Sequence, residues 1–306
     1  MLEKELKVSV KMITYKHEKF IKQAIEGVLM QETDFKFDLI ISDDCSPDNT
    51  HKIVNEIIIN HSKGFKIKYF RHQKNIGMID NGVFAINKCT GKYIAYCEGD
   101  DYWTDALKLQ KQVDFMEKNI SYSCCAHYSY TKYDTLNEPE VQLYNQAYKN
   151  NGIFGKKDFM HVNKFHTSSL LIRKNYINQF LNDNPVTHRD NILKIKLLQF
   201  GYIKVLPETM STYRRNETGI SQKININRLY QTEIASTIAL GKELKGFYLK
   251  SLYLRSHWHK YYLINEKNLS FLYKVKLFFK FLIPSFYRFP RNIRDILSSI
   301  YNGFLK

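Results

Sequence analysis

Three carboxyl groups fall within a single turn of the chain, Glu98-Gly99-Asp100-Asp101. The turn follows a strand-like run, residues 92–97, and precedes the aromatic pair Tyr102-Trp103. Carboxylates this close together repel one another unless a cation or hydroxyl donors stabilise them. Hard divalent cations such as Mg²⁺ or Mn²⁺ prefer oxygen ligands, and a nucleoside diphosphate supplies more of them. The turn therefore indicates a site for a nucleotide diphosphate and a metal, and the alternative is a solvated acidic turn.

A second acidic cluster, residues 43–48, also follows an apolar run, residues 37–42. The chain opens in the same way, with an apolar run at residues 8–13 that leads into polar residues 14–18. Apolar residues recur at helical spacing between these runs, at residues 20–29 and 53–58. This alternation predicts a parallel sheet with helical crossovers. Ligands bind such sheets at the carboxyl ends of the strands, which is where the acidic residues fall.

The ordered series of these segments resembles the family 2 glycosyltransferases, which have the GT-A fold. Residues 8–15 resemble the opening strand, although Lys16 stands where the family usually has Asn. Other matching segments are Asp43-Asp44-Cys45-Ser46 (an Asp-Asp-x-Ser signature), Asn75-Ile76-Gly77 with Asn81, and Gly91–Ala95 leading into the acidic turn (an Asp-x-Asp segment). The match is close over residues 6–118 and looser to about residue 221. It implies an α/β fold, with a mostly parallel Rossmann-like sheet flanked by helices in residues 1–225 and a helical, basic extension in residues 226–306.

The resemblance also implies roles for individual residues. The metal, Mn²⁺ or Mg²⁺, falls to Asp101 together with Asp100, and the general base is Asp190. The implied nucleotide-sugar site consists of Ile13, Thr14, Tyr15, Asp43, Asp44, Asn81, Asp100, Arg214 and Arg215.

Asp190 also has a simpler explanation. It precedes a helical apolar pattern at residues 192–198, and Asp is favoured at a helix start by free backbone N–H groups and by the macrodipole. The two roles are compatible, because the same N–H groups keep the carboxylate ionised. Residues 201–208 and 211–215 resemble the strand and the Tyr-Arg segment that follow this helix in the family.

These expectations together predict an inverting glycosyltransferase that uses a nucleotide-diphosphate sugar, with a UDP-sugar favoured. The expected acceptor is a glycan or lipid-linked hydroxyl in cell-surface polysaccharide synthesis. One alternative is a catalytically inert nucleotide-sugar-binding subunit, which Asp100, Asp101 and Asp190 disfavour. A nucleotidyltransferase is a further alternative, but it would need a glycine-rich phosphate loop that residues 14–18 lack.

The length of 306 residues allows a large core, in one domain or two. The five cysteines have no Cys-x-x-Cys spacing and several lie in apolar runs, so we expect buried thiols in a reducing compartment. Residues 1–7 lack the apolar core of a signal peptide, which predicts a cytoplasmic protein.

The C-terminal stretch is both basic and aromatic. The chain has a formal net charge of +16, and residues 245–306 hold twelve Lys or Arg against Glu266 and Asp295. Lysines interrupt the aromatic run at residues 271–283, so it is too short to span a bilayer and suits the headgroup region of an anionic membrane. We therefore expect a peripheral protein on the inner face of the cell membrane. Packing on the catalytic domain and nucleic-acid binding are the alternatives, and no nucleic-acid module supports the latter.

Overall fold

The computed structural model describes residues 6–133, 141–144, 150–156, 158, 165–179 and 190–215. All of these residues belong to the first of two compact units, Met1–Gln222. The expectations for residues 226–306, which are a helical extension and a membrane-associating surface, lie outside the described residues, as does the predicted domain boundary at residue 225.

Strands and helices alternate along the described chain, as the sequence predicts. The helices are α1 (Ile21–Leu29), α2 (Thr50–Asn60), α3 (Met78–Lys88), α4 (Lys108–Lys118), α5 (Lys174–Asn178) and α6 (Asp190–Phe200). The strands are β1 (Leu6–Thr14), β2 (Lys36–Asp43), β3 (Ile67–Arg71), β4 (Tyr93–Tyr96), β5 (Tyr102–Trp103), β6 (Tyr122–Tyr133), β7 (Val141–Tyr144), β8 (Ile153–Phe154), β9 (Leu171–Arg173) and β10 (Tyr202–Arg215).

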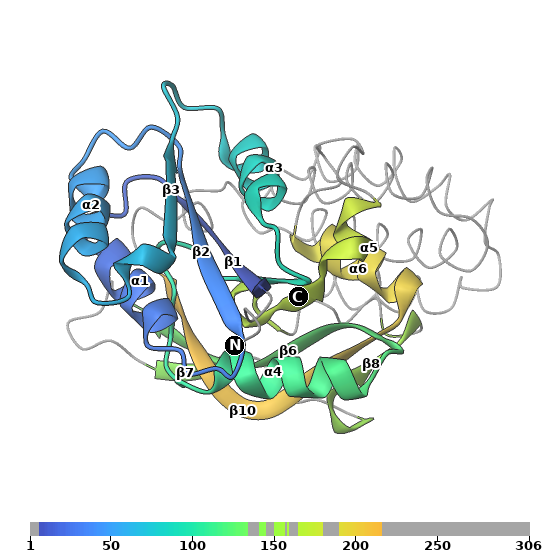
Figure 1. Ribbon diagram of the computed structural model, residues 1–306. Helices are drawn as coiled ribbons and strands as arrows, with labels where there is room; N and C mark the ends of the chain where they lie inside the picture. The colour runs from blue at the N-terminus through green and yellow to red at the C-terminus, as the bar shows by residue number, and fades with distance from the viewer. Residues whose placement is uncertain are drawn as a thin grey trace, which may run out of the picture. The chain divides into compact units, whose positions relative to one another are not determined.

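The strands form one mixed sheet in the order β3-β2-β1-β4-β9-β6-β10-β5, with β7 on β6 and β8 on β10. Strands β1 to β4 pair in parallel, and β6 and β10 are also parallel to each other. The remaining pairs are antiparallel. The carboxyl ends of β1, β2 and β4 therefore meet at one edge, so the acidic residues that follow these strands lie near one another. The sheet curls, and β10 sweeps beneath the other strands in Figure 1.

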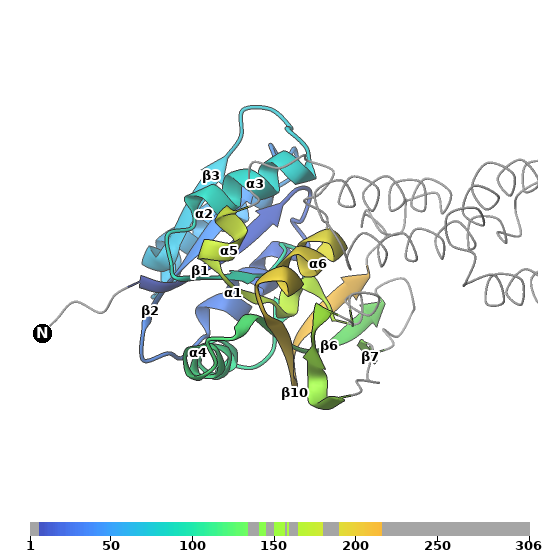
Figure 2. The same ribbon diagram turned by 90° about the vertical axis from the view of Figure 1, so that its right-hand side faces the viewer.

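Helices cover both faces of the sheet. The main core lies on the face of α1, α2 and α4, where apolar side chains such as Ile25, Val54 and Val113 pack on Val10 and Leu39 of the central strands. Helices α3, α5 and α6 lie together on the other side (Figures 1 and 2). The helical spacing of residues 20–29 and 53–58 predicts α1 and α2 correctly, because apolar residues three and four apart share one helix face.

A very short strand joins the two halves of the sheet. The sequence predicts a strand over residues 165–173, but the structure has a 3₁₀ turn at Thr167–Ser169 and then the three-residue strand β9. Side chains satisfy the turn's carbonyls in place of a neighbouring strand, because Trp103 Nε1 donates to Ser168 O (2.9 Å) and Gln112 Nε2 to Ser169 O (2.8 Å). Strand β9 then pairs antiparallel with both β4 and β6.

Two further properties of the described residues concern the state of the cysteine thiols and the length and hydrophobicity of the helices. All five thiols are free, and all except that of Cys45 are buried. Over the ranges given above, no helix is both long enough and apolar enough to cross a bilayer.

Candidate active site

The acidic turn, residues 98–101, follows β4 and lies against the end of β1. The backbone N–H of Gly99 donates to Ile13 O at 3.0 Å. A Cβ at Gly99 would lie 2.8 Å from both His17 Nδ1 and Thr14 Oγ1, so any side chain there would push the turn away from β1. Glycine therefore holds the acidic residues against the β1 loop.

Asp101 is an interior carboxylate. Its side chain is 2% exposed, and Oδ1 accepts a hydrogen bond from the backbone N–H of Arg214 at 3.0 Å. Oδ2 lies 3.5 Å from His166 Nδ1. Burial raises the pKa of Asp101 well above its usual range, and the charge of Asp100 adds to this rise. The residue thus fastens the acidic turn to β10.

His166 and His17 flank the two aspartates, and neither is an expected site residue. The His166 ring stacks on Tyr213 with centroids 4.1 Å apart, and its Nδ1 accepts from the backbone N–H of Ser168 at 3.2 Å. Burial lowers the pKa of His166 to about 3, so the ring is neutral at physiological pH. No local motif marks His166, because its contact with Asp101 joins residues far apart in the sequence.

Asp100 is the more open of the two aspartates. Its side chain is 21% exposed, and Oδ2 lies 3.8 Å from His17 Nε2. The backbone carbonyl of Asp100 accepts a hydrogen bond from Arg214 Nη1 at 2.8 Å. Asp100 therefore presents a carboxylate that a ligand can reach, on a backbone that Arg214 holds in place.

The adjacent arginines take different environments. Arg214 is buried, with its guanidinium 4.7 Å from the Phe20 ring and 4.9 Å from the Tyr102 ring, and it also donates to Gln23 Oε1. Arg215 is exposed. Successive residues of a strand point to opposite sides, so only one of the two can join the interior contacts of the acidic turn.

Asp43, at the end of β2, is fully buried and already hydrogen bonded. Oδ1 accepts from the backbone N–H of Ser46 at 2.8 Å, and Oδ2 accepts from the Tyr69 hydroxyl at 2.7 Å. Burial together with this hydrogen bond raises the pKa of Tyr69. These contacts give Asp43 a structural role in shaping the loop that begins with Asp44.

Asp44 holds the start of α3. Its two carboxylate oxygens accept from consecutive backbone N–H groups, those of Ile76 (2.7 Å) and Gly77 (3.0 Å). Its own backbone N–H donates to Thr14 O at 3.0 Å. Asp44 thus connects the ends of β1 and β2 to the loop before α3. The resemblance implies that Asp44 belongs to the nucleotide-sugar site.

The other expected donor-site residues differ in accessibility. Tyr15 is 38% exposed beside the buried Thr14, and Ile13 is partly exposed. Asn81, in contrast, is 2% exposed. Its Nδ2 donates to Ser42 O at 3.1 Å, and its Oδ1 lies 3.1 Å from His72 Nε2. The structure therefore brings residues 13–15, Asp44 and the acidic turn together, whereas Asn81 packs behind them.

Asp190 begins α6 and is exposed, as the helix-start pattern predicts. Its negative charge adds to the raised pKa values of Glu98 and Tyr96, which are raised chiefly by burial. Asp190 is therefore close enough to the acidic turn to act on it electrostatically, although Asp101 and Asp190 are 89 positions apart in the sequence.

No group of three His, Cys, Asp or Glu residues is placed to hold a metal in the part of the chain that the structure describes. A cation bound with a diphosphate needs only one or two carboxylates, because phosphate oxygens and water complete the shell. The partly exposed carboxylate of Asp100, with Asp101 beside it, fits such a ligand set.

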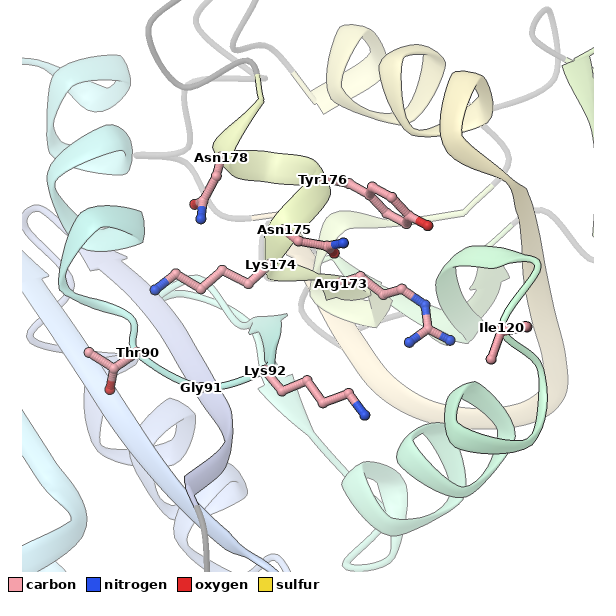
Figure 3. Close-up of a pocket in the computed structure, with 9 residues that line it drawn as sticks. All are labelled: Thr90, Gly91, Lys92, Ile120, Arg173, Lys174, Asn175, Tyr176 and Asn178. Carbon is pink, nitrogen blue, oxygen red and sulfur yellow. The ribbon is translucent and has the colours of Figure 1, made fainter.

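A cavity of about 520 Å³ lies elsewhere, at the amino end of β4 (Figure 3). Two of the cations that line it, Lys92 and Arg173, form ion pairs or hydrogen bonds within the protein. Lys92 Nζ lies 2.8 Å from both oxygens of Glu117, and Arg173 donates to the carbonyls of Tyr122 and Met116. The lining residues are Thr90, Gly91, Lys92, Ile120, Arg173, Lys174, Asn175, Tyr176 and Asn178, and none of them is an expected site residue.

Comparison with known proteins identifies the family of the chain. The family model of glycosyl transferase family 2 matches residues 9–180. The chain belongs to this family. An uncharacterized protein of Mycobacterium tuberculosis (strain ATCC 25618 / H37Rv) is 31% identical over 223 residues, which are 70% of this chain and 60% of that protein. This family member thus spans less than two thirds of that relative's length.

Two further proteins extend the comparison. The putative teichuronic acid biosynthesis glycosyltransferase TuaG of Bacillus subtilis (strain 168) is 25% identical over 221 residues, covering 70% of this chain and 81% of TuaG. The crystal structure of S. aureus TarS residues 1–349 with UDP-GlcNAc superposes with a TM-score of 0.61 at 16% identity, covering 90% of this chain and 73% of that one. That likeness identifies the fold of this family 2 glycosyltransferase as GT-A.

Proposed function

We propose that the protein is an inverting glycosyltransferase that moves a sugar from a nucleoside-diphosphate donor, with a UDP-sugar favoured, to a hydroxyl of a glycan or lipid-linked acceptor. The observation that carries this proposal is that the charge of Asp190 acts on Glu98 of the acidic turn, at the carboxyl end of the sheet. A single displacement needs groups that stabilise the leaving diphosphate and a base for the attacking hydroxyl. Asp100 and Asp101 of the acidic turn are proposed for the first role, through a cation, and Asp190 for the second.

The nucleotide lies against the β1 end in this proposal. Tyr15 is exposed beside Thr14, and Asp44 fixes the loop before α3 through the N–H groups of Ile76 and Gly77. Residues 13–15 therefore flank the base. Asp43 and Asn81 act from behind by shaping the two loops. Of the two arginines, Arg215 faces outward and is the one that can reach a diphosphate, while Arg214 positions Asp100.

Asp100 and Asp101 are the proposed residues for Mn²⁺ or Mg²⁺. The contacts favour Asp100 as the direct ligand, because it is partly exposed while Asp101 is buried and bonded to the Arg214 N–H. When bound, the cation offsets the negative charge that develops on the diphosphate.

Asp190 is the proposed base. It takes the proton of the acceptor hydroxyl as that oxygen bonds to the anomeric carbon, while the bond from the anomeric carbon to the phosphate oxygen breaks and the diphosphate leaves with the electron pair. Attack from the face opposite the leaving group inverts the anomeric configuration. General-base help of this kind contributes about 10²–10⁴-fold in rate.

A screen of UDP- and GDP-sugars, with and without Mn²⁺, tests this function through thermal stabilisation, donor hydrolysis and transfer to glycoside acceptors. Asp190→Asn is expected to bind donor as the wild type does and to lose transfer by about 10²–10⁴-fold. Asp114→Asn, an exposed Asp on α4, is the matched control and should transfer normally. Wild-type protein that turns over no nucleotide sugar, or Asp190→Asn that keeps more than about a tenth of the rate, would contradict the proposal.

Cell-surface polysaccharide synthesis at the inner membrane face is the proposed setting. TuaG is named for teichuronic acid biosynthesis, and residues 245–306 carry twelve basic residues against two acidic ones. Anionic lipids attract each Lys or Arg near their surface by on the order of 1 kcal/mol. Full-length protein should therefore cosediment with phosphatidylserine vesicles, less so at high salt, while a truncation after Gly241 should not. Equal sedimentation of both proteins would favour a tail that packs on the catalytic domain.

A further inference from the structure

A buried lysine lies in the middle of the parallel half of the sheet. Lys11 of β1 is 5% exposed and pairs in register with Tyr96 of β4. Its Nζ donates to Glu98 Oε1 at 3.0 Å and lies 4.7 Å from the centroid of the Tyr96 ring. Lysine is rarely buried without a partner, and a buried ion pair is generally no more stabilising than apolar residues of the same size. Stability alone therefore does not account for this pair.

The pair leaves two buried polar atoms without a hydrogen-bond partner among the described residues. Lys11 engages only one oxygen of Glu98, and the other, Oε2, is buried and unpaired. The hydroxyl of Tyr96, a residue that is 4% exposed, is also buried and unpaired. Because nearly all buried polar atoms in proteins are hydrogen bonded, two such atoms on residues that contact the same lysine indicate that something else completes their contacts.

Both atoms belong to residues whose pKa values the charge of the proposed base raises further. The charge of Asp190 acts on both Glu98 and Tyr96, and the charge of Glu98 acts on Tyr96. A carboxylate oxygen accepts a hydrogen bond from a hydroxyl, and a phenol can donate to one or accept from one. Neither group suits a phosphate, which the Glu98 carboxylate would repel. A sugar hydroxyl matches both.

We propose that Glu98 Oε2 and the Tyr96 hydroxyl form a sugar-hydroxyl-binding site at the start of the acidic turn, and that Lys11 positions Glu98 within it. This inference rests on the proposed function and adds to it the residues that recognise the sugar. Lys11 holds Glu98 by one oxygen and offsets its charge, which leaves the other oxygen without a partner among the described residues. The hydroxyl belongs either to the donor's sugar or to the acceptor, and the experiment separates these two sources.

Glu98→Gln and Tyr96→Phe test the site. In calorimetry with UDP-GlcNAc and with UDP, a contact to the donor sugar lowers the affinity for UDP-GlcNAc about tenfold or more and leaves the affinity for UDP unchanged. A contact to the acceptor instead raises the KM for p-nitrophenyl glycoside acceptors by a similar factor and leaves donor hydrolysis unchanged. Either result supports the site and identifies the source. Normal values in all these measurements would overturn it.

Tyr93→Phe is the matched control for Tyr96→Phe. Tyr93 is a buried tyrosine of the same strand, but its hydroxyl accepts from Arg173 Nη1 at 3.1 Å. Tyr93→Phe should therefore lower the melting temperature and leave sugar recognition unchanged. Tyr96→Phe should do the reverse. A clear drop in melting temperature for Tyr96→Phe would mean that its hydroxyl is paired inside the fold, which overturns the proposal even if the wild type turns over no sugar.

A double variant separates sugar binding from neutralisation of Lys11. If Glu98 served only to balance that charge, Lys11→Met/Glu98→Gln would restore wild-type sugar recognition, and the proposal would fail. If Glu98 binds sugar, the double variant stays impaired while it melts at the wild-type temperature or above. A wild-type protein that binds no nucleotide sugar defeats the proposed function, whereas impaired and restored variants of an active enzyme decide this inference alone.

Discussion

The two ends of the parallel strands carry charge in different ways. At the carboxyl ends, Asp100 and Asp101 are neighbours, and burial raises the pKa of Asp101 while the charge of Asp100 adds to this rise. At the amino end of β4, two cations of the 520 Å³ cavity have partners within the protein, because Lys92 pairs with Glu117 and Arg173 donates to backbone carbonyls. Two adjacent carboxylates, such as Asp100 and Asp101, favour the binding of a cation that offsets their charge. A lysine that already pairs with a glutamate, such as Lys92, has no such need for a ligand. The cavity at the amino end is therefore not where the chemistry is expected.

The largest expected effect separates the two aspartates at the carboxyl end. Asp100→Ala should lower transfer by about 10²–10³-fold and abolish the response to Mn²⁺ without changing the melting temperature. Asp101→Ala should lower the free energy of unfolding by about 1–3 kcal/mol, because it leaves the buried Arg214 N–H unpaired. Steady-state transfer assays and thermal melts of both variants measure the difference. The reverse pattern, with Asp100 needed for stability and Asp101 not, would contradict the assignment of the direct ligand.

A second prediction concerns the buried charge behind the acidic turn. Lys108 is fully buried against Trp103, and burial lowers its pKa to about 7. The unfolded chain keeps that proton up to about pH 10.5, so between pH 7 and 10 the unfolded state binds more protons than the folded state. Stability should therefore rise with pH there, by up to about 1.4 kcal/mol per unit from this group.

Lys108→Met should remove this pH dependence and raise the melting temperature at pH 7. Denaturant unfolding at several pH values measures both effects. Lys111→Met is the control, because Lys111 is partly exposed and pairs with Asp105 at 2.6 Å. Parallel pH curves for wild type and Lys108→Met would show that Lys108 is charged throughout this range in the folded protein.

The smallest effect is expected at the amino end. Lys174→Ala, in the cavity wall, should change the free energy of unfolding by no more than about 0.5 kcal/mol and leave donor affinity unchanged. Arg173→Met should be destabilising, because its guanidinium donates to Tyr122 O, Met116 O and Tyr93 OH. Calorimetry with UDP and thermal melts test both. Weaker UDP binding in Lys174→Ala would make the amino-end cavity part of the donor site.

Much of the fold can be predicted from the sequence because strand and helix periods differ. The alternating segments up to residue 60 match β1, α1, β2 and α2, and Asp190 does begin α6. The strand expected over residues 165–173 is mostly a turn, since contacts from Trp103 and Gln112 outweigh the local apolar pattern. Local sequence patterns do not reveal contacts with side chains that are distant in the sequence.

The site is less predictable than the fold for the same reason. Motif positions identify Asp44 and Asp100, but the partners of Asp101, which are His166 and the Arg214 N–H, come from distant segments. The inward orientation of Arg214 and the outward one of Arg215 depend on the register of β10. Lys11 stands inside an apolar run of the sequence, and only the pairing of β1 with β4 shows that Glu98 is its partner.

The three residues of β9 have a consequence for cooperativity. Leu171 and Ile172 are fully buried, and this strand alone links β4 to β6 in the order of the sheet. So few backbone hydrogen bonds make a narrow hinge line between the part of the sheet that holds the nucleotide loops and the part that carries α6. Proteins often open in contiguous units of different stability. Native-state hydrogen exchange should resolve two such units that divide at β9, with β1 to β4 in one and β6 and β10 in the other.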